Sequence, residues 1–224
     1  MNLPFTVDEF LALFESYNRA IWPAQAMGYA LGVLATGLAL WRSRAGDRIV
    51  VAVLALMWLW TGVVYHIFFF SEINRAAFAF GAAFVLQSVL LAVYGVFQNE
   101  LRFRVRPSSY GVIGGFFILY AMLIYPLIGL RLGHVYPQSP MFGVSPCPVT
   151  IFTFGLLLWA EPPVPRMVMF LPFVWSVIGF VAALHLGILE DIGLLAAGVA
   201  GSLMIIHHER SLTKARLEAV KGQR

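Results

Sequence analysis

Residues 49–70 read IVVAVLALMWLWTGVVYHIFFF, a stretch without a single charged side chain. About 20 such apolar residues in a helix span the roughly 30 Å hydrocarbon core of a bilayer. The whole chain has this character, since 60% of its 224 residues are hydrophobic, only 12% are charged and the mean hydropathy is +0.83. A soluble domain carries roughly 25% charged residues. The composition therefore excludes a disordered chain or a disulfide scaffold and predicts a polytopic membrane protein.

Six further stretches have the same apolar character and are separated by short connections. Most of them are long enough, or nearly so, to form a membrane-spanning helix. Together with residues 49–70 they predict an all-α fold, a bundle of about seven transmembrane helices that occupies residues 21–206. The six stretches cover residues 23–41, 74–97, 110–130, 147–160, 164–186 and 191–206.

The two ends of the chain differ from this predicted bundle. Thr6 and Glu9 have the spacing of a capping box, and apolar residues follow at helical intervals. Residues 1–20 are therefore predicted to form an amphipathic helix at the membrane interface, with a simple lead-in to the first span as the alternative. At the other end, residues 207–224 carry five Lys and Arg side chains, which predicts a basic cytoplasmic tail.

Lysine and arginine are distributed unevenly between alternate connections. Twelve of the fifteen fall in the first, third and fifth loops and the C-terminal tail, whereas three fall in the N-terminal segment and the remaining loops. Because cytoplasmic loops are enriched in these residues, we expect seven spans with the N-terminus outside and the C-terminus in the cytoplasm. The net charge of +4 then has a topological cause, and no nucleic-acid partner is expected.

This topology gathers polar side chains at the outer ends of the predicted helices. Imidazole and thiolate together suit zinc, copper or heme iron, so Cys147, His66 and His134 are candidate ligands of a transition metal or heme. The alternative is that interfacial histidine and tyrosine side chains contact lipid headgroups. Two carboxylates, Glu190 and Asp191, follow the apolar stretch 164–186 at the same end. The candidate ligand-binding residues are His66, Glu72, Asn74, His134, Tyr136, Cys147 and His185.

The only cysteine, Cys147, lies between Pro146 and Pro148. Two prolines at alternate positions disfavour a regular helix through the cysteine, whereas the second proline suits a first helical turn. A helix over residues 148–160 would be only about 20 Å long, which is less than the hydrocarbon thickness. Cys147 is therefore predicted to lie in non-helical backbone at membrane depth, shielded by protein or reached by water.

Gln87 lies near the middle of the apolar stretch 74–97, where a buried amide needs a hydrogen-bond partner. No Asp, Glu, Lys or Arg lies at the middle of any predicted span. This pattern argues against an ion-driven pump with a deep carboxylate relay.

Several short motifs stand out along the chain. They are Asn18, Trp22-Pro23 and Gln25; Tyr65-His66, Phe69 and Asn74; and Gly133-His134, Tyr136-Pro137 and Pro146-Cys147-Pro148-Val149-Thr150. Together these motifs resemble an uncharacterised family of bacterial membrane proteins, a domain of unknown function whose members are sometimes labelled permeases. The resemblance covers nearly the whole chain. It implies a multi-pass protein of the bacterial inner membrane and no established activity.

Three functional hypotheses follow from the sequence. The first is a membrane protein whose outward-facing His, Cys and carboxylate site binds or transports a metal ion, heme or a small polar ligand. The second is a structural or accessory subunit of a larger membrane complex, for which the partners are the lipid bilayer and another membrane protein or further copies of the chain. The third is a membrane enzyme that uses Cys147 as a reactive thiol, although the sequence contains no recognised catalytic motif.

Overall fold

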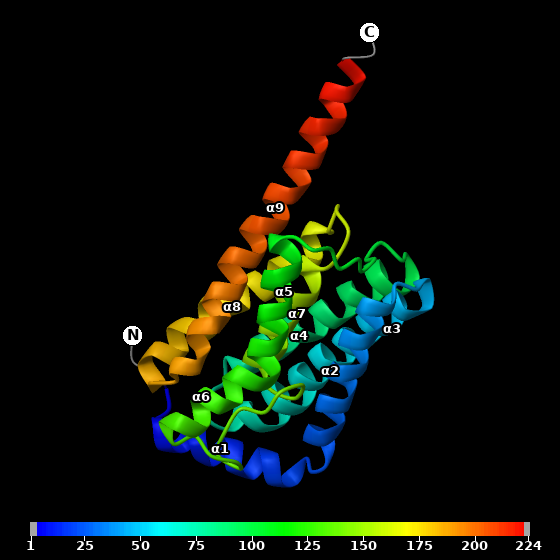
Figure 1. Cartoon of the computed structure of the whole chain (residues 1–224). Helices are drawn as coiled ribbons and strands as arrows, with labels where there is room; N and C mark the ends of the chain where they lie inside the picture. The colour runs from blue at the N-terminus through cyan, green and yellow to red at the C-terminus, as the bar shows by residue number, and fades with distance from the viewer. Residues whose placement is uncertain (1–3, 222–224) are drawn as a thin grey trace.

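The computed structural model describes residues 4–221 and is all-helical (Figure 1). Across that range the sole β-type pairing is an isolated bridge between Phe103 and Ala160. The α-helices are α1 Val7–Ala20, α2 Ala24–Trp41, α3 Arg44–Trp60, α4 Ala77–Leu91, α5 Ser109–Leu119, α6 Tyr125–Leu132, α7 Pro146–Leu158, α8 Arg166–Leu186 and α9 Ile192–Lys221.

Several α-helices continue without a break into segments of different pitch. Three of these are π-helical, η1 Thr61–Phe69, η3 Ala92–Phe97 and η4 Tyr120–Ile124. Two are short 3₁₀ turns, η2 Phe70–Glu72 and η5 Leu189–Asp191. A π-helical segment inside a longer helix often marks a functional site, because it changes which side chains share a face.

All seven apolar stretches of the sequence are helical, as predicted. Six helical segments of the described chain are long and apolar enough to cross a membrane, namely Ala24–Trp41, Arg44–Glu72, Ala77–Phe97, Ser109–Leu132, Arg166–Leu186 and Leu189–Ala215. The remaining one, α7, has 13 residues and is shorter, as the sequence indicates. The protein is therefore a multi-pass helical bundle, and the count of seven spans stays a prediction that depends on α7.

The predicted N-terminal amphipathic helix is present as α1. Thr6 and Glu9 form the expected capping box, with the Glu9 side chain accepting the Thr6 backbone N–H at 2.7 Å and the Thr6 hydroxyl accepting the Glu9 N–H at 3.2 Å. The hydrogen bond from the Thr6 backbone N–H contributes most, and the one from the Thr6 side chain contributes less. Together they hold the pKa of Glu9 below its usual value of 4.5. Residues 1–3 of the predicted segment lie outside the described residues.

The bundle has two different ends, and contacts between loops define each of them. At the basic end, Arg42 donates to the Val105 carbonyl at 2.7 Å and Arg166 pairs with Glu209 at 2.6 Å, so the arginine-bearing loops and α9 meet there. At the opposite end, which we name the cavity end, Asn18 of α1 donates to the Pro137 carbonyl at 2.7 Å.

Figure 1 shows α1 lying across the cavity end and α9 extending past the bundle at the basic end. Residues 207–221 of the predicted tail continue α9 rather than forming a separate unit, and residues 222–224 are not described. The arginine-rich connections thus share one end, as their alternation along the chain predicts, while the direction of the bundle in a membrane stays a prediction.

The short helix α7 lies at the centre of the bundle. Every one of its residues except Cys147 is buried, which is typical of a helix that is apolar on all sides. Its few polar side chains are satisfied inside the protein, because Trp58 of α3 donates to the Thr153 hydroxyl at 3.0 Å and Thr153 donates to the Val149 carbonyl at 2.7 Å. Cys147 is therefore the one side chain of the central helix that is partly exposed.

The predicted start of α7 was wrong by two residues. The helix begins at Pro146, with Ser145 in the preceding cap position, so Cys147 is helical. The prolines do not break the helix because the first four N–H groups of any helix lack an intrahelical acceptor, and a residue without N–H loses nothing there. Both Pro146 and Pro148 fall within this first turn.

The non-helical backbone expected before α7 is present one segment earlier, at residues 140–145, and protein shields it as predicted. Tyr17 of α1 donates to the Val144 carbonyl at 2.6 Å, and the Met141 N–H donates to the Ser145 hydroxyl at 2.9 Å. Gly28 of α2 lets this segment approach, because a Cβ at this glycine would lie 3.0 Å from the Phe142 carbonyl oxygen.

Gln87 has the partner that its position requires. Its amide nitrogen donates to the Val168 carbonyl of α8 at 2.8 Å. That carbonyl lies four residues before Pro172, which has no N–H to complete the helical hydrogen bond. The amide therefore repairs a gap in the backbone of the neighbouring helix, and we assign Gln87 a structural role.

Candidate functional site

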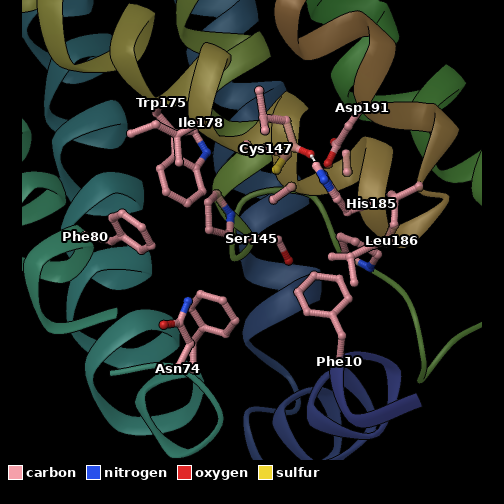
Figure 2. A pocket seen from close by; sticks show the side chains of 18 of the residues that line it. Phe10, Asn74, Phe80, Ser145, Cys147, Trp175, Ile178, His185, Leu186 and Asp191 are labelled. Carbon is pink, nitrogen blue, oxygen red and sulfur yellow. Dashed lines mark hydrogen bonds between the residues drawn. The ribbon is translucent and has the colours of Figure 1, made fainter. Parts of the chain in front are cut away.

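The cavity end encloses a cavity of about 430 Å³ between α1, η1, α4, α7, α8 and the start of α9 (Figure 2). Its wall is mostly aromatic and aliphatic. The aromatic rings are those of Phe5, Phe10, Phe14, Tyr65, Phe70, Phe80 and Trp175, and the polar side chains on the wall are Asn74, Ser145, Cys147, His185 and Asp191. A cavity of this size and character is typical of a small-molecule site.

The ends of two helices place the most polar part of the wall. Asp191 immediately precedes α9, and its carboxyl oxygen Oδ1 accepts the Tyr125 hydroxyl at 2.8 Å. The side chain of Asp191 faces the cavity and retains 5% exposure. Cys147, in the first turn of α7, lies beside this carboxyl group on the same wall (Figure 2). Asp191 and Cys147 are 44 positions apart in the chain and meet only through the packing of α7 against α9.

His185 and Asn74 also line the cavity, as predicted for site residues. The Nδ1 atom of His185 lies 2.7 Å from the Val181 carbonyl, so this ring is held against its own helix α8. The Asn74 side-chain oxygen accepts the Ala76 N–H at 3.0 Å and shapes the turn before α4. Both side chains therefore line the cavity while they hydrogen-bond to backbone groups near them in the chain.

His66 lies behind the cavity wall. Its side chain is completely buried in η1, and neither ring nitrogen has a hydrogen-bond partner among residues 4–221. Its ring packs against those of Phe84 and Trp175, with centroid distances of 4.7 and 5.1 Å. Since Trp175 also lines the cavity, one layer of aromatic side chains separates His66 from it.

His134 belongs to a separate polar contact. Its Nδ1 atom lies 2.8 Å from Oε1 of Glu190, a carboxyl group with no exposure. The backbone carbonyl of Glu190 accepts the Tyr120 hydroxyl at 2.7 Å. His134 therefore ties the loop after α6 to the turn between α8 and α9, and it does not line the cavity.

The last two predicted residues point away from the cavity. Glu72 and Tyr136 are exposed, and neither contributes to the cavity wall. For Tyr136 the exposure agrees with the alternative that interfacial tyrosine side chains contact lipid headgroups.

The structure does not bring the predicted metal ligands together. Cys147 lies beside Asp191, His134 pairs with Glu190, and His66 is enclosed by rings. No group of three or more His, Cys, Asp or Glu side chains with a metal-binding arrangement occurs within the described range of the chain.

Sequence reasoning missed Asp191 as a site residue. The sequence did contain a signal for it, because Glu190 and Asp191 follow the apolar stretch 164–186 at the predicted outer face. The sequence could not distinguish which of the two carboxyl groups faces the cavity and which pairs with a histidine.

Two motif residues near the N-terminus fix the mouth of the cavity. Asn18 is buried and donates to the carbonyls of Pro137 and Ser139 at 2.7 and 2.8 Å. Gln25 in turn donates to the Asn18 carbonyl at 2.7 Å. These amides hold α1 and the loop after α6 in one arrangement, which keeps α1 over the cavity.

Comparison with known proteins identifies a family. The model of a family of unknown function (DUF6064) matches residues 7–216. No curated protein and no solved structure matches the chain. The chain belongs to this family of unknown function, which confirms the resemblance to an uncharacterised domain family.

Proposed function

We propose that the protein is a membrane-embedded binding protein for a small amphipathic molecule, which it holds in the cavity at the cavity end. The positive-inside pattern of Lys and Arg supports an outward-facing position for this end. The ligand has an apolar body, which matches the aromatic and aliphatic wall, and a polar group, which matches the wall formed by Asp191 and Cys147.

The observation that carries the proposal is a single carboxyl group in an apolar cavity. Burying a polar group in apolar surroundings is costly unless it has partners, and ionisable residues within membrane segments usually serve a function. Tyr125 satisfies one oxygen of Asp191, while the side chain still faces the cavity. A ligand whose polar group contacts Asp191 or Cys147 gains both this contact and the burial of its apolar body.

The surface of α8 supports entry from the lipid. Val177, Ile178 and Val181 are exposed on the bundle and also line the cavity. A molecule dissolved in the outer half of the bilayer would therefore reach the site without crossing water, as suits a poorly soluble ligand. The rings of Phe10 and Phe14 on α1 cover the site from the end of the bundle.

Among the hypotheses from the sequence, this proposal keeps the ligand site and changes its chemistry. A metal ion needs several converging donors, whereas Asp191, Cys147 and His185 line the cavity without forming a metal-binding arrangement among the described residues. The enzyme hypothesis needs a base that activates the thiol of Cys147. The Asp191 carboxyl lies beside this thiol, and it would have to act as that base.

Photolabelling can test whether the cavity holds a ligand. The protein in lipid nanodiscs is exposed to a neutral alkyl alcohol that carries a diazirine, irradiated, and analysed by peptide mass spectrometry. We expect saturable labelling of the segments that line the cavity, around residues 70–80 and 175–186, and competition by excess unlabelled alcohol.

A matched pair of variants on α8 localises the effect. Ala182→Trp fills the cavity from its wall, and Leu184→Trp adds the same ring on the exposed face of the helix. Saturable labelling should disappear in the first variant and remain in the second. Labelling that never saturates, or that both variants leave unchanged, would show that the cavity holds no ligand.

A further inference from the structure

The cavity wall has one acidic side chain and no lysine or arginine beside it. Asp191 is the only Asp or Glu on the wall, and the residues that line the cavity in the described part of the chain include no Lys or Arg. None of the ion pairs among the described side chains involves Asp191, whereas the nearby His134 lies against Glu190. A buried carboxylate normally has a counter-charge, and the described side chains supply none to Asp191.

The other titratable groups around Asp191 do not replace this counter-charge. Tyr125 donates a neutral hydrogen bond, and Cys147 is a thiol that faces the same carboxyl group. His185 is directed to the Val181 carbonyl, and His66 lies behind Trp175 without reaching the cavity. The neighbouring Glu190 does not line the cavity and lies 2.8 Å from Nδ1 of His134.

The remaining wall is rich in aromatic rings, which attract cations. The face of an aromatic ring carries negative potential, and it attracts a cation that lies within about 6 Å of the ring centre. The rings of Tyr65, Phe70 and Trp175 line the same cavity as Asp191. Aromatic rings together with a carboxylate are the combination that recognises ammonium groups.

We propose that the ligand is a lipophilic organic cation, an amine or quaternary ammonium group on an apolar body, whose charged group lies between Asp191 and the aromatic wall. This inference rests on the proposed function and specifies the ligand class of the same cavity. An anionic amphiphile is disfavoured because it would meet the carboxyl group, whereas a cation stabilises the ionised form of Asp191 and a neutral amphiphile gains no such ion pair.

Three probes that share a phenylbutyl body test the sign of the charge. They are 4-phenylbutyl-trimethylammonium, its neutral analogue in which carbon replaces the nitrogen, and 5-phenylpentanoate as the anion. Each competes with the diazirine alcohol in nanodiscs of zwitterionic phosphatidylcholine, so that the lipid surface does not attract one probe selectively. The ammonium should compete at a concentration about tenfold or more below that of the neutral analogue, and the anion should be the weakest.

Substitutions assign the preference to its source. Asp191→Asn should reduce the ammonium preference over the neutral analogue to about onefold while binding of the neutral analogue persists, which also shows that the variant is folded. Glu72→Gln removes an exposed carboxylate that does not line the cavity and should leave the preference unchanged. Trp175→Leu should weaken the ammonium more than the neutral analogue and provides a second test if Asp191→Asn fails to fold.

The outcomes separate this inference from the proposed function. Equal competition by the ammonium and the neutral analogue in the unmodified protein would overturn the cation inference and leave the cavity as a binding site. A preference that survives in Asp191→Asn would overturn it as well. If no probe competes and labelling never saturates, the proposed function itself fails.

Discussion

The two ends of the bundle treat buried carboxylates in opposite ways. At the basic end, Asp47 has no exposed surface, accepts the Phe103 N–H at 3.1 Å and lies 3.5 Å from Arg104. At the cavity end, Asp191 is almost as buried and has a neutral partner, Tyr125, but no cationic one. The comparison indicates that the basic end is built for stability, whereas the cavity end keeps polar groups available for a ligand.

The largest expected effect is at the basic end. Asp47→Ala leaves the buried Phe103 N–H without an acceptor and Arg104 without its partner, and we expect it to lower the free energy of unfolding by about 3 kcal/mol. Asp191→Ala is the matched substitution at the cavity end and should cost less than about 1 kcal/mol, because the loss of the Tyr125 hydrogen bond is offset by removing a carboxyl group that is costly to bury in an apolar cavity. Unfolding in mixed detergent micelles measures both, and equal losses would remove the contrast between the two ends.

The next effect tests whether the cavity end has a structural contact of its own. His134→Ala leaves the fully buried Glu190 carboxyl without its partner, and we expect a loss of about 2 kcal/mol. Hydrogen exchange of residues 133–145 should speed up because the loop loses its attachment to the turn before α9. Tyr136→Ala changes an exposed side chain of the same loop and serves as the control. Unchanged exchange in His134→Ala would contradict the proposed attachment.

A smaller effect lies in the middle of the bundle, between the two ends. Gln87→Leu should cost about 1 kcal/mol, because the Val168 carbonyl loses the donor that replaces the missing N–H of Pro172. In a Pro172→Ala background the helix regains that N–H, so the same Gln87→Leu change should cost close to nothing. A double-mutant cycle measures this coupling, and identical costs in both backgrounds would show that the amide does not compensate for the proline.

The smallest effect concerns α1, the helix that covers the cavity. Hydrogen bonds from Thr6 lower the pKa of Glu9, so the charged carboxylate stabilises the helix start above its unfolded pKa near 4.5, and this stabilisation is lost as the pH falls through the lowered folded value. Hydrogen exchange of residues 7–10, corrected for its intrinsic pH dependence, should therefore accelerate below about pH 4.5. Glu9→Gln retains a capping side chain without a charge, and its exchange should lack this dependence.

Much of the fold could be predicted from sequence, and the reason is local. Residues 49–70 carry no charge over the length of a span. Thr6 and Glu9 form their capping-box hydrogen bonds within one helical turn. The arginine residues that alternate along the chain also predict which loops meet at the basic end, where Arg42 and Val105 are in contact. Such signals depend on neighbours in the chain or on a simple two-sided environment.

The candidate site was predicted only in part, because helices that are apolar on nearly all sides give no signal of their rotation. Lipid is as apolar as the protein interior, so hydrophobicity does not say which face of a span turns inward. The sequence therefore predicted that His66 and Cys147 lie at the same end of the bundle, but it could not tell whether they share a site. In the structure His66 packs against Phe84 and Cys147 lies beside Asp191, so the two do not act as ligands of one metal.

By itself, the sequence determined the class of the protein, the order and approximate ends of its helices, and which loops share an end, since these follow from hydropathy, capping and charge along the chain. The tertiary structure decided that Asp191 faces an aromatic cavity beside Cys147 while the adjacent Glu190 turns to His134. Those neighbours are 44 and 56 positions apart, and only the packing and rotation of α7, α8 and α9 bring them together.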